Sequence, residues 1–208
     1  MFYEHSSKKF SSLFSVKNSF SDSKYLRALK ALGLKEAESF KSIEQNVDRI
    51  LKVNSVVNDI GPEDSVIVDV PGKGDCWLIA FLSPLLGYIV SEADEGRVID
   101  HVRKKLSETV KNDPEKFEDI FEGGNEGLMK WVEGVRKPKS WGGDDEFEVL
   151  ARVTGLCIHV LNREAPNMEG VRHFLPICPE GINEEDFWAS SIVMEYGFSH
   201  YRAVLPRR

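Results

Sequence analysis

Residues 66–88 read VIVDVPGKGDCWLIAFLSPLLGY and join an apolar strand, a glycine-containing turn and a cysteine. The first five residues are mostly apolar and β-branched, which predicts a buried strand. A proline and two glycines then interrupt the pattern, and the apolar run from Trp77 to Leu82 favours a helix. Cys76 is thereby predicted at a helix N-terminus, where partial positive charge and unpaired N–H groups stabilise a thiolate and can bind an oxyanion. The same position also suits a small, buried hydrophobic side chain, so both interpretations stand.

The composition is that of one globular domain with a modest extension, since the chain has 208 residues and 41% hydrophobic content. It contains no run of 18 apolar residues, which predicts no membrane span, and its start has no apolar segment typical of a secretory signal. Three cysteines without metal-binding spacing favour reduced thiols in a cytoplasmic setting. The net charge of −7 argues against nucleic-acid binding and permits a basic partner.

We expect three parts along the chain. A flexible basic arm rich in Ser and Phe covers residues 1–22, a helical extension covers 23–62, and the main domain covers 63–208. Within them the patterns of apolar residues, caps, prolines and glycines predict helices over 24–32, 35–57, 94–110, 113–121, 126–132 and 144–154. They also predict strands over 156–161, 190–196 and 201–205, with an edge strand within 171–177. Helices packed around a few late strands indicate a mixed α and β domain.

A cysteine nucleophile needs a base within hydrogen-bond reach, usually a histidine, and often a third group that orients the ring. His200 is the preferred candidate because it begins the last predicted strand after a glycine turn, where a side chain can project into a cleft. His159 lies within a predicted strand and is interpreted as a buried structural histidine. The other three histidines are His5 in the arm, His101 on the exposed side of a helix and His173 in an irregular segment.

Three blocks of this sequence resemble the signature blocks of the ovarian-tumour (OTU) family of cysteine deubiquitinases. They read GKGDCW at 72–77, WGGDDEFEVLA at 141–151 and SHYRAV at 199–204, and they occur in the family's order. The resemblance covers about residues 65–207. It implies an α+β, papain-like OTU domain, in which a small central sheet is flanked by helices. The N-terminal helical extension predicted from the residue pattern precedes this domain.

The resemblance also implies site residues. Cys76 matches the family's nucleophile and His200 its general base, without a metal or organic cofactor. The backbone N–H groups of Lys73, Gly74 and Asp75 would bind the oxyanion. The substrate channel would include Trp141, Gly142, Gly143 and Asp144. The acids Asp144, Asp145 and Glu146 would either pair with arginines of the ubiquitin tail or serve as charges that cap a helix N-terminus.

Two positions depart from the family's pattern. Lys73 replaces the usual aspartate three residues before the cysteine, and Arg202 replaces the Asn or Asp that is often the third catalytic residue. The side chain of Lys73 would either favour the thiolate or point into water. The orienting acid is therefore open, with Asp48, Asp59, Asp64 and Asp69 as candidates. We name Asp69, on the strand that enters the loop, although it could equally face solvent.

The resemblance implies a cysteine protease that hydrolyses isopeptide bonds to ubiquitin or polyubiquitin and acts as a monomer. Two alternatives are a catalytically weak ubiquitin-binding pseudo-enzyme and a protease for another ubiquitin-like modifier or a polyprotein. The compact size and the unusual N-terminal extension favour a pathogen effector, which would act in the host cytosol.

Overall fold

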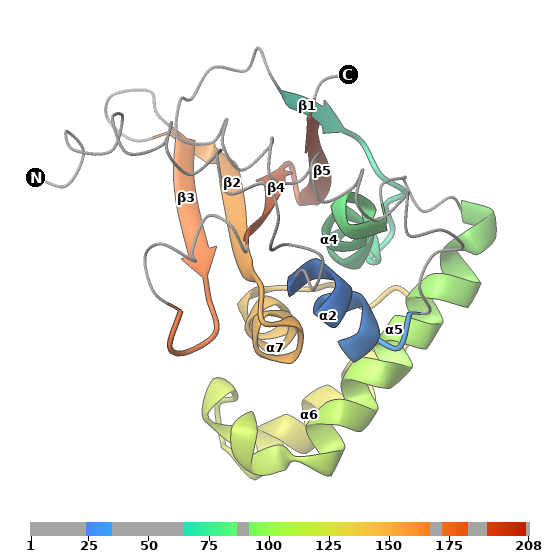
Figure 1. Ribbon diagram of the computed structural model, residues 1–208, viewed down its shortest axis with the longest axis vertical. Helices are drawn as coiled ribbons and strands as arrows, with labels where there is room; N and C mark the ends of the chain where they lie inside the picture. Colours follow the sequence, from blue (N-terminus) through green and yellow to red (C-terminus); the bar gives the residue numbers. More distant parts are fainter. Residues whose placement is uncertain (1–23, 35–64, 87–91, 167–171, 183–190, 207–208) are drawn as a thin grey trace, which may run out of the picture.

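The computed structural model describes residues 24–34, 65–86, 92–166, 172–182 and 191–206. Within these ranges the sheet has five strands in the order β1-β5-β4-β2-β3 (Figure 1). Strands β2 and β4 run parallel, and the other neighbouring pairs are antiparallel. The strands are β1 Ser65–Val68, β2 Cys157–Pro166, β3 Arg172–Ile177, β4 Ser191–Gly197 and β5 His200–Pro206.

Helices lie mainly on one side of this sheet (Figure 1). The described helices are α2 Lys24–Ala31, α4 Cys76–Leu86, α5 Glu92–Asn112, α6 Asn125–Val135 and α7 Asp144–Thr154. Helix α4 packs on β5 and β4, α2 packs on α7, and α5 contacts both α6 and α7. None of the helices in the described ranges is both long and apolar enough to cross a bilayer.

Helix α4 forms the centre of the hydrophobic core. Its residues from Trp77 to Leu82 are apolar on every side and fully buried, which is typical of a helix surrounded by protein. The strands contribute the side chains of Ile158, Ile192, Met194 and Ala203 to the same core. Because Cys76 is the first residue of α4, the best-packed element of the domain holds the predicted nucleophile.

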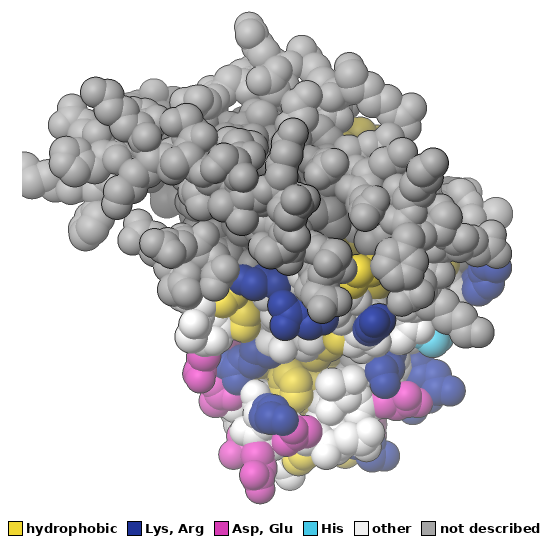
Figure 2. Space-filling view, viewed as in Figure 1, with side chains coloured by type: hydrophobic (Ala, Val, Ile, Leu, Met, Phe, Trp, Pro, Cys, Tyr) yellow, Lys and Arg dark blue, Asp and Glu magenta, His cyan; other side chains and the backbone are white. Residues whose placement is uncertain are grey.

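The outer surface around α2, α5, α6 and α7 carries charge of both signs. Lys and Arg side chains lie among Asp and Glu side chains there, with small hydrophobic areas between them (Figure 2). Two 3-10 turns, Pro114–Lys116 and Glu118–Ile120, connect α5 to α6. Arg152 binds Asp119 of the second turn through two hydrogen bonds of 2.6 and 2.7 Å.

Most expected elements are confirmed. The bounds of α7 are those predicted, and the predicted edge strand is β3. One difference is the segment 113–121, which forms two 3-10 turns in place of one helix. The break lies at Phe117, whose φ of −131° is outside the helical range and separates the two turns. The predicted arm 1–22, the helix 35–57 and the boundary at 62/63 lie outside the described residues.

The expectation of three reduced thiols is wrong for two of them. Cys157 and Cys178 form a disulfide, while Cys76 is free. Strand register explains the pairing, because Ile158 lies opposite Ile177 in the antiparallel pair β2–β3 and the two cysteines extend that pair by one residue each. The sequence alone does not indicate this disulfide, because the chain has an odd number of cysteines and they are widely spaced.

Candidate active site

The loop between β1 and α4 delivers Cys76 to the start of its helix. The carbonyl of Asp75 accepts hydrogen bonds from the N–H groups of Leu78 and Ile79, at 3.1 and 3.0 Å, which begins the helical ladder. Lys73 and Gly74 both have positive φ, at 68° and 97°. A Cβ atom on Gly74 would lie 1.9 Å from the carbonyl oxygen of Lys139. Glycine is therefore required here for its backbone angle and for the close approach of a second loop.

The Cys76 side chain is buried, with 1% of the residue exposed. Burial raises the pKa of its thiol above the ordinary value, and hydrogen bonds from the backbone N–H groups of Tyr201, Trp77 and Cys76 itself oppose that effect. The neighbouring carboxylate of Asp75 raises the pKa further. The helix N-terminus therefore does not offset the cost of burial in the free protein, so the thiol needs a base to remove its proton.

His200 is held at the start of β5 by a tight turn. Gly197 pairs with His200 across the turn, and the two residues between them, Phe198 and Ser199, have φ of 56° and 57°. Two central residues with positive φ are typical of the hairpin turns that match strand twist. The turn thus fixes where the imidazole leaves the sheet, next to the backbone of Tyr201 that contacts the thiol.

The imidazole of His200 lies between Asp69 and the loop before the cysteine. Its Nε2 is 2.9 Å from Oδ1 of Asp69. Its Nδ1 and Cε1 atoms lie within 4 Å of the Cβ position of Gly72. An ionised carboxylate can only accept a hydrogen bond, so Nε2 donates and Nδ1 carries the free lone pair. Asp69 follows directly after β1, and its side chain is 81% exposed, against 24% for His200.

The other acids considered from the sequence, Asp48, Asp59 and Asp64, lie outside the described residues. Arg202 binds Glu195 on β4, with Nη2 2.8 Å from Oε1. These two residues are directly opposite in the β4–β5 register, and the Glu195 side chain is fully buried. The position two residues after His200 therefore serves a cross-strand ion pair.

Trp141 and Gly142 lie beside the loop that holds Cys76. A Cβ atom on Gly142 would lie 2.4 Å from the Trp77 ring, and the Trp77 Nε1–H donates to the carbonyl of Ser140 at 3.1 Å. Trp141 itself is 61% exposed. The segment is thus anchored through the backbone around it, while the indole of Trp141 faces solvent.

The three acids at the start of α7 differ in their surroundings. Glu146 accepts the N–H of Gly143 at 2.7 Å through Oε2 and the indole N–H of Trp131 at 2.9 Å through Oε1. Its carboxylate therefore caps α7 and ties it to α6. Asp144 and Asp145 are exposed. The pKa of the Asp145 carboxyl is raised by partial loss of its hydration and by the charges of Asp144 and Glu148.

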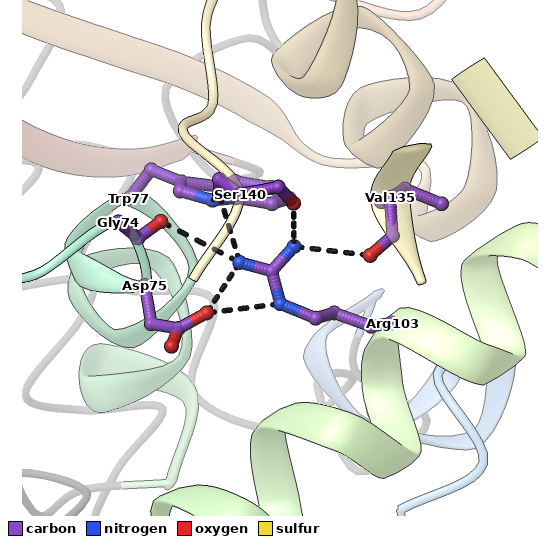
Figure 3. A network of polar contacts seen from close by, with 6 residues as sticks. All are labelled: Gly74, Asp75, Trp77, Arg103, Val135 and Ser140. Atoms are coloured by element: carbon purple, nitrogen blue, oxygen red, sulfur yellow. Dashed lines mark hydrogen bonds and ion pairs between the residues drawn. The ribbon is translucent and has the colours of Figure 1, made fainter. Parts of the chain in front are cut away.

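Sequence reasoning did not identify Arg103, a buried residue of α5 that binds both loops around Cys76 (Figure 3). A signal was present, because Arg103 lies at helical spacing from Ile99, Leu106 and Val110, which are buried apolar residues. A single arginine within such a stripe indicates a buried ionic partner.

Lys73, which replaces the aspartate usual three residues before the cysteine, is exposed to solvent.

The other four histidines were not predicted to act as the base, and none of those that the structure describes contacts Cys76 or Asp69 in it. His159 is buried, with Nε2 2.9 Å from Ser191 Oγ, and burial lowers its pKa to about 4. His101 donates from Nε2 to the carbonyl of Gly33 at 2.9 Å and joins α5 to the end of α2. The backbone of His173 lies in β3 opposite Asn162, and His5 is not described. Within the described residues, no cluster of three His, Cys, Asp or Glu side chains is suited to a metal ion.

A thiol at a helix N-terminus and an imidazole hydrogen-bonded to a carboxylate are the groups that a cysteine protease requires. Residues 71–201 match the OTU-like cysteine protease family, and the chain belongs to that family. The expected α+β OTU fold is likewise confirmed by solved structures that share it.

One curated relative is the ubiquitin thioesterase otu2 of Schizosaccharomyces pombe, 29% identical over 126 residues. The match covers 54% of this chain and 39% of that protein, so the chain spans well under half the length of this relative. Among solved structures, the OTU domain of OTUD1 has a TM-score of 0.52 at 13% identity, covering 75% of this chain and 95% of that one.

Two further structures are similar in fold. The viral OTU protease of Dera Ghazi Khan virus has a TM-score of 0.51 at 15% identity, covering 70% of this chain and 83% of that one. An OTU deubiquitinase from Wolbachia pipientis wMel, solved bound to ubiquitin, has a TM-score of 0.50 at 17% identity, covering 70% of this chain and 98% of that one. At these identities the likeness concerns the fold.

Proposed function

We propose that the protein is a thiol-dependent deubiquitinase, which hydrolyses the isopeptide bond between the C-terminus of ubiquitin and a lysine amine. The observation that carries this proposal is the convergence of three elements. The Cys76 thiol lies beside the backbone of Tyr201, the His200 ring lies against Gly72, and Asp69 binds the far nitrogen of that ring. Family membership and the relative named a ubiquitin thioesterase support ubiquitin as the substrate.

The reaction begins when Nδ1 of His200 takes the thiol proton of Cys76 and the thiolate attacks the carbonyl carbon of ubiquitin's terminal glycine. The C–N bond then breaks as His200 gives the proton to the leaving lysine amine, and ubiquitin stays on Cys76 as a thioester. Water, deprotonated by His200, hydrolyses the thioester and regenerates the thiol. Because burial raises the pKa of Cys76, His200 is needed as a base at neutral pH.

The oxyanion of each tetrahedral intermediate needs donors that are already oriented. We assign this role to backbone N–H groups of the loop Lys73–Asp75 and of Cys76. Each such donor contributes about 3–4 kcal/mol to stabilising the transition state. Asp69 orients His200 through Nε2, which keeps the lone pair on the nitrogen that accepts the thiol proton.

The tail of ubiquitin would approach past Trp141. We assign Trp141, Gly142 and Gly143 to the wall of the tail channel, since Ser140 and Gly142, on either side of Trp141, lie against Trp77, the residue after Cys76. The exposed carboxylates of Asp144 and Asp145 suit the arginines of the tail. Glu146 is assigned to the capping of α7 instead, since its carboxylate accepts hydrogen bonds from Gly143 and Trp131.

The test uses ubiquitin with a thiol-reactive electrophile at its C-terminus, incubated with the full chain. The parent is expected to form a one-to-one covalent adduct, Cys76→Ala none, and His200→Gln an adduct at a much lower rate. His101→Gln is the matched control, since His101 is an exposed histidine on α5, and it should react like the parent.

Two results would contradict the proposal. A folded parent that binds ubiquitin without forming an adduct would support the pseudo-enzyme alternative. An adduct with another ubiquitin-like modifier, in the absence of one with ubiquitin, would assign the site to that modifier.

A further inference from the structure

Arg103 lies at the centre of a buried polar network beside the candidate site (Figure 3). Only 1% of the residue is exposed. The guanidinium contacts two segments that are far apart in the sequence, the loop that ends at Cys76 and the segment that precedes Trp141. A fully buried arginine whose partners belong to two different loops fixes their relative position.

The contacts to the first loop involve Asp75 and Gly74. Nε donates to Oδ1 of Asp75 at 2.9 Å, and Nη2 binds the same oxygen. Nη2 also lies 3.4 Å from the carbonyl oxygen of Gly74. Asp75 is itself 4% exposed, so arginine neutralises a buried carboxylate one residue before the thiol.

The contacts to the second segment involve Val135 and Ser140. Nη1 donates to the carbonyl of Val135 at 3.1 Å and to Oγ of Ser140 at 2.6 Å. Nη2 donates to the carbonyl of Ser140 at 2.9 Å. The residue after Ser140 is Trp141, the first residue of the proposed tail channel.

Further contacts join the same two loops. The Trp77 indole donates to the carbonyl of Ser140 at 3.1 Å, and the Arg103 guanidinium lies 5.3 Å from the centre of that indole ring, in cation–π range. The tight approach of Gly74 to Lys139 has no room for a side chain. The two loops are therefore packed as one unit, and Arg103 supplies most of the polar contacts between them.

We propose that Arg103 is a positioning residue, which holds the oxyanion loop and the start of the tail channel in one geometry. This inference rests on the proposed function for its effect on turnover. Arginine suits the role because its planar fork reaches Asp75 and Ser140 together, whereas the ammonium group of lysine supplies a point charge. Arg103→Lys thus keeps the charge beside Asp75 and removes the fork.

The test compares the parent, Arg103→Lys and Arg152→Lys in the full chain. Arg152 is a matched control, since it also binds a carboxylate through two hydrogen bonds, to Asp119, and lies in the last turn of α7. For Arg103→Lys we expect the kcat for hydrolysis of a ubiquitin C-terminal amide to fall about 100-fold, because small misplacements of catalytic groups have effects of that size. Arg152→Lys is expected to stay within about threefold of the parent, since its partners Asp119, Glu148 and the carbonyl of Lys116 belong to neither loop.

A second readout separates positioning from general damage. Alkylation of Cys76 by iodoacetamide needs the thiolate but no oxyanion donors. Because Arg103→Lys keeps the positive charge near the thiol, we expect the alkylation rate of this variant to change less than about threefold. General loosening of the fold would instead slow hydrolysis and speed alkylation, because it exposes a buried thiol whose pKa is raised by burial.

Hydrogen exchange measured by mass spectrometry tests the same inference without any substrate. Peptides that cover 72–75 and 136–141 should exchange faster in Arg103→Lys, while peptides from β4 should not change. Faster exchange in both loops with no hydrolysis by the parent would refute the proposed function and uphold the positioning role. Unchanged exchange in both loops, or turnover equal to the parent, would overturn the inference.

Discussion

The hydrogen bond from His200 to Asp69 is proposed to orient the catalytic imidazole, although the carboxylate that accepts it is exposed to solvent. The carboxylate is 81% exposed, so water replaces it readily when it is removed. In a buried triad, mutation of the orienting aspartate lowers kcat by about 10⁴-fold, and such a hydrogen bond is worth much less when water competes for it. We therefore expect Asp69→Ala to lower kcat only about tenfold, measured as hydrolysis of a ubiquitin C-terminal amide.

Two further variants show whether the loss of activity in Asp69→Ala comes from the lost hydrogen bond. Asp69→Asn keeps an oxygen that can accept the Nε2 proton, so it should retain more activity than Asp69→Ala. Asp100→Ala removes an exposed carboxylate from α5 and should match the parent. If Asp69→Ala has the full activity of the parent, another residue orients His200.

Much of the candidate site could be predicted from local sequence, because its parts are contiguous motifs. Cys76 follows a glycine turn and His200 begins a strand, and both features are visible in a short window. Asp69 could only be named among four acids, since the choice depends on the antiparallel pairing of β1 with β5. Arg103 was missed because its partners are 28 and 37 residues away, and spacing along α5 alone does not identify them.

At the scale of elements, the parallel pair β2–β4 contains a buried histidine. His159 of β2 lies 2.9 Å from the hydroxyl of Ser191, the first residue of β4. Burial lowers the His159 pKa from 6.5 to about 4. Between these values the unfolded chain binds a proton that the folded protein excludes, so this histidine makes stability fall as pH falls.

We expect His159→Gln to reduce the acid sensitivity of the fold. Relative to pH 7, the parent should lose on the order of 3 kcal/mol more of its unfolding free energy by pH 4 than the variant does. Urea unfolding at several pH values measures this difference, and His101→Gln shows what removal of an exposed histidine does. Parallel pH profiles for His159→Gln and the parent would show that His159 titrates normally.

The elements themselves differ in how far the sequence predicts them. Helix α7 could be bounded because glycines flank it and acids fill its first turn, which are local signals. The sheet order could not be predicted, because β2 and β4 pair in parallel across a long connection. Register between distant strands depends on the packing of α4 against them, and no single window contains that information.

At the scale of the whole molecule, the cysteines divide into one buried free thiol and one disulfide. The disulfide joins the first residue of β2 to Cys178, just after β3, and closes a loop with a sequence separation of 21. A cross-link of this length stabilises a fold by about 3 kcal/mol, mainly by restricting the unfolded chain. Disulfides are uncommon in a reducing cytosol. The protein would therefore be less stable in a reducing compartment than in an oxidising one.

Thiol titration and thermal unfolding test this assignment together. The Cys76→Ser variant should have no reactive thiol when denatured without reductant and two thiols after reduction. Its melting temperature should fall on reduction by roughly 6–12 °C, the shift expected for about 3 kcal/mol in a protein of this size. Cys76→Ser with Cys157→Ser is the control, and reduction should leave its melting temperature unchanged. Two thiols in the unreduced Cys76→Ser variant would show that Cys157 and Cys178 are not linked, which would contradict the assignment of the disulfide.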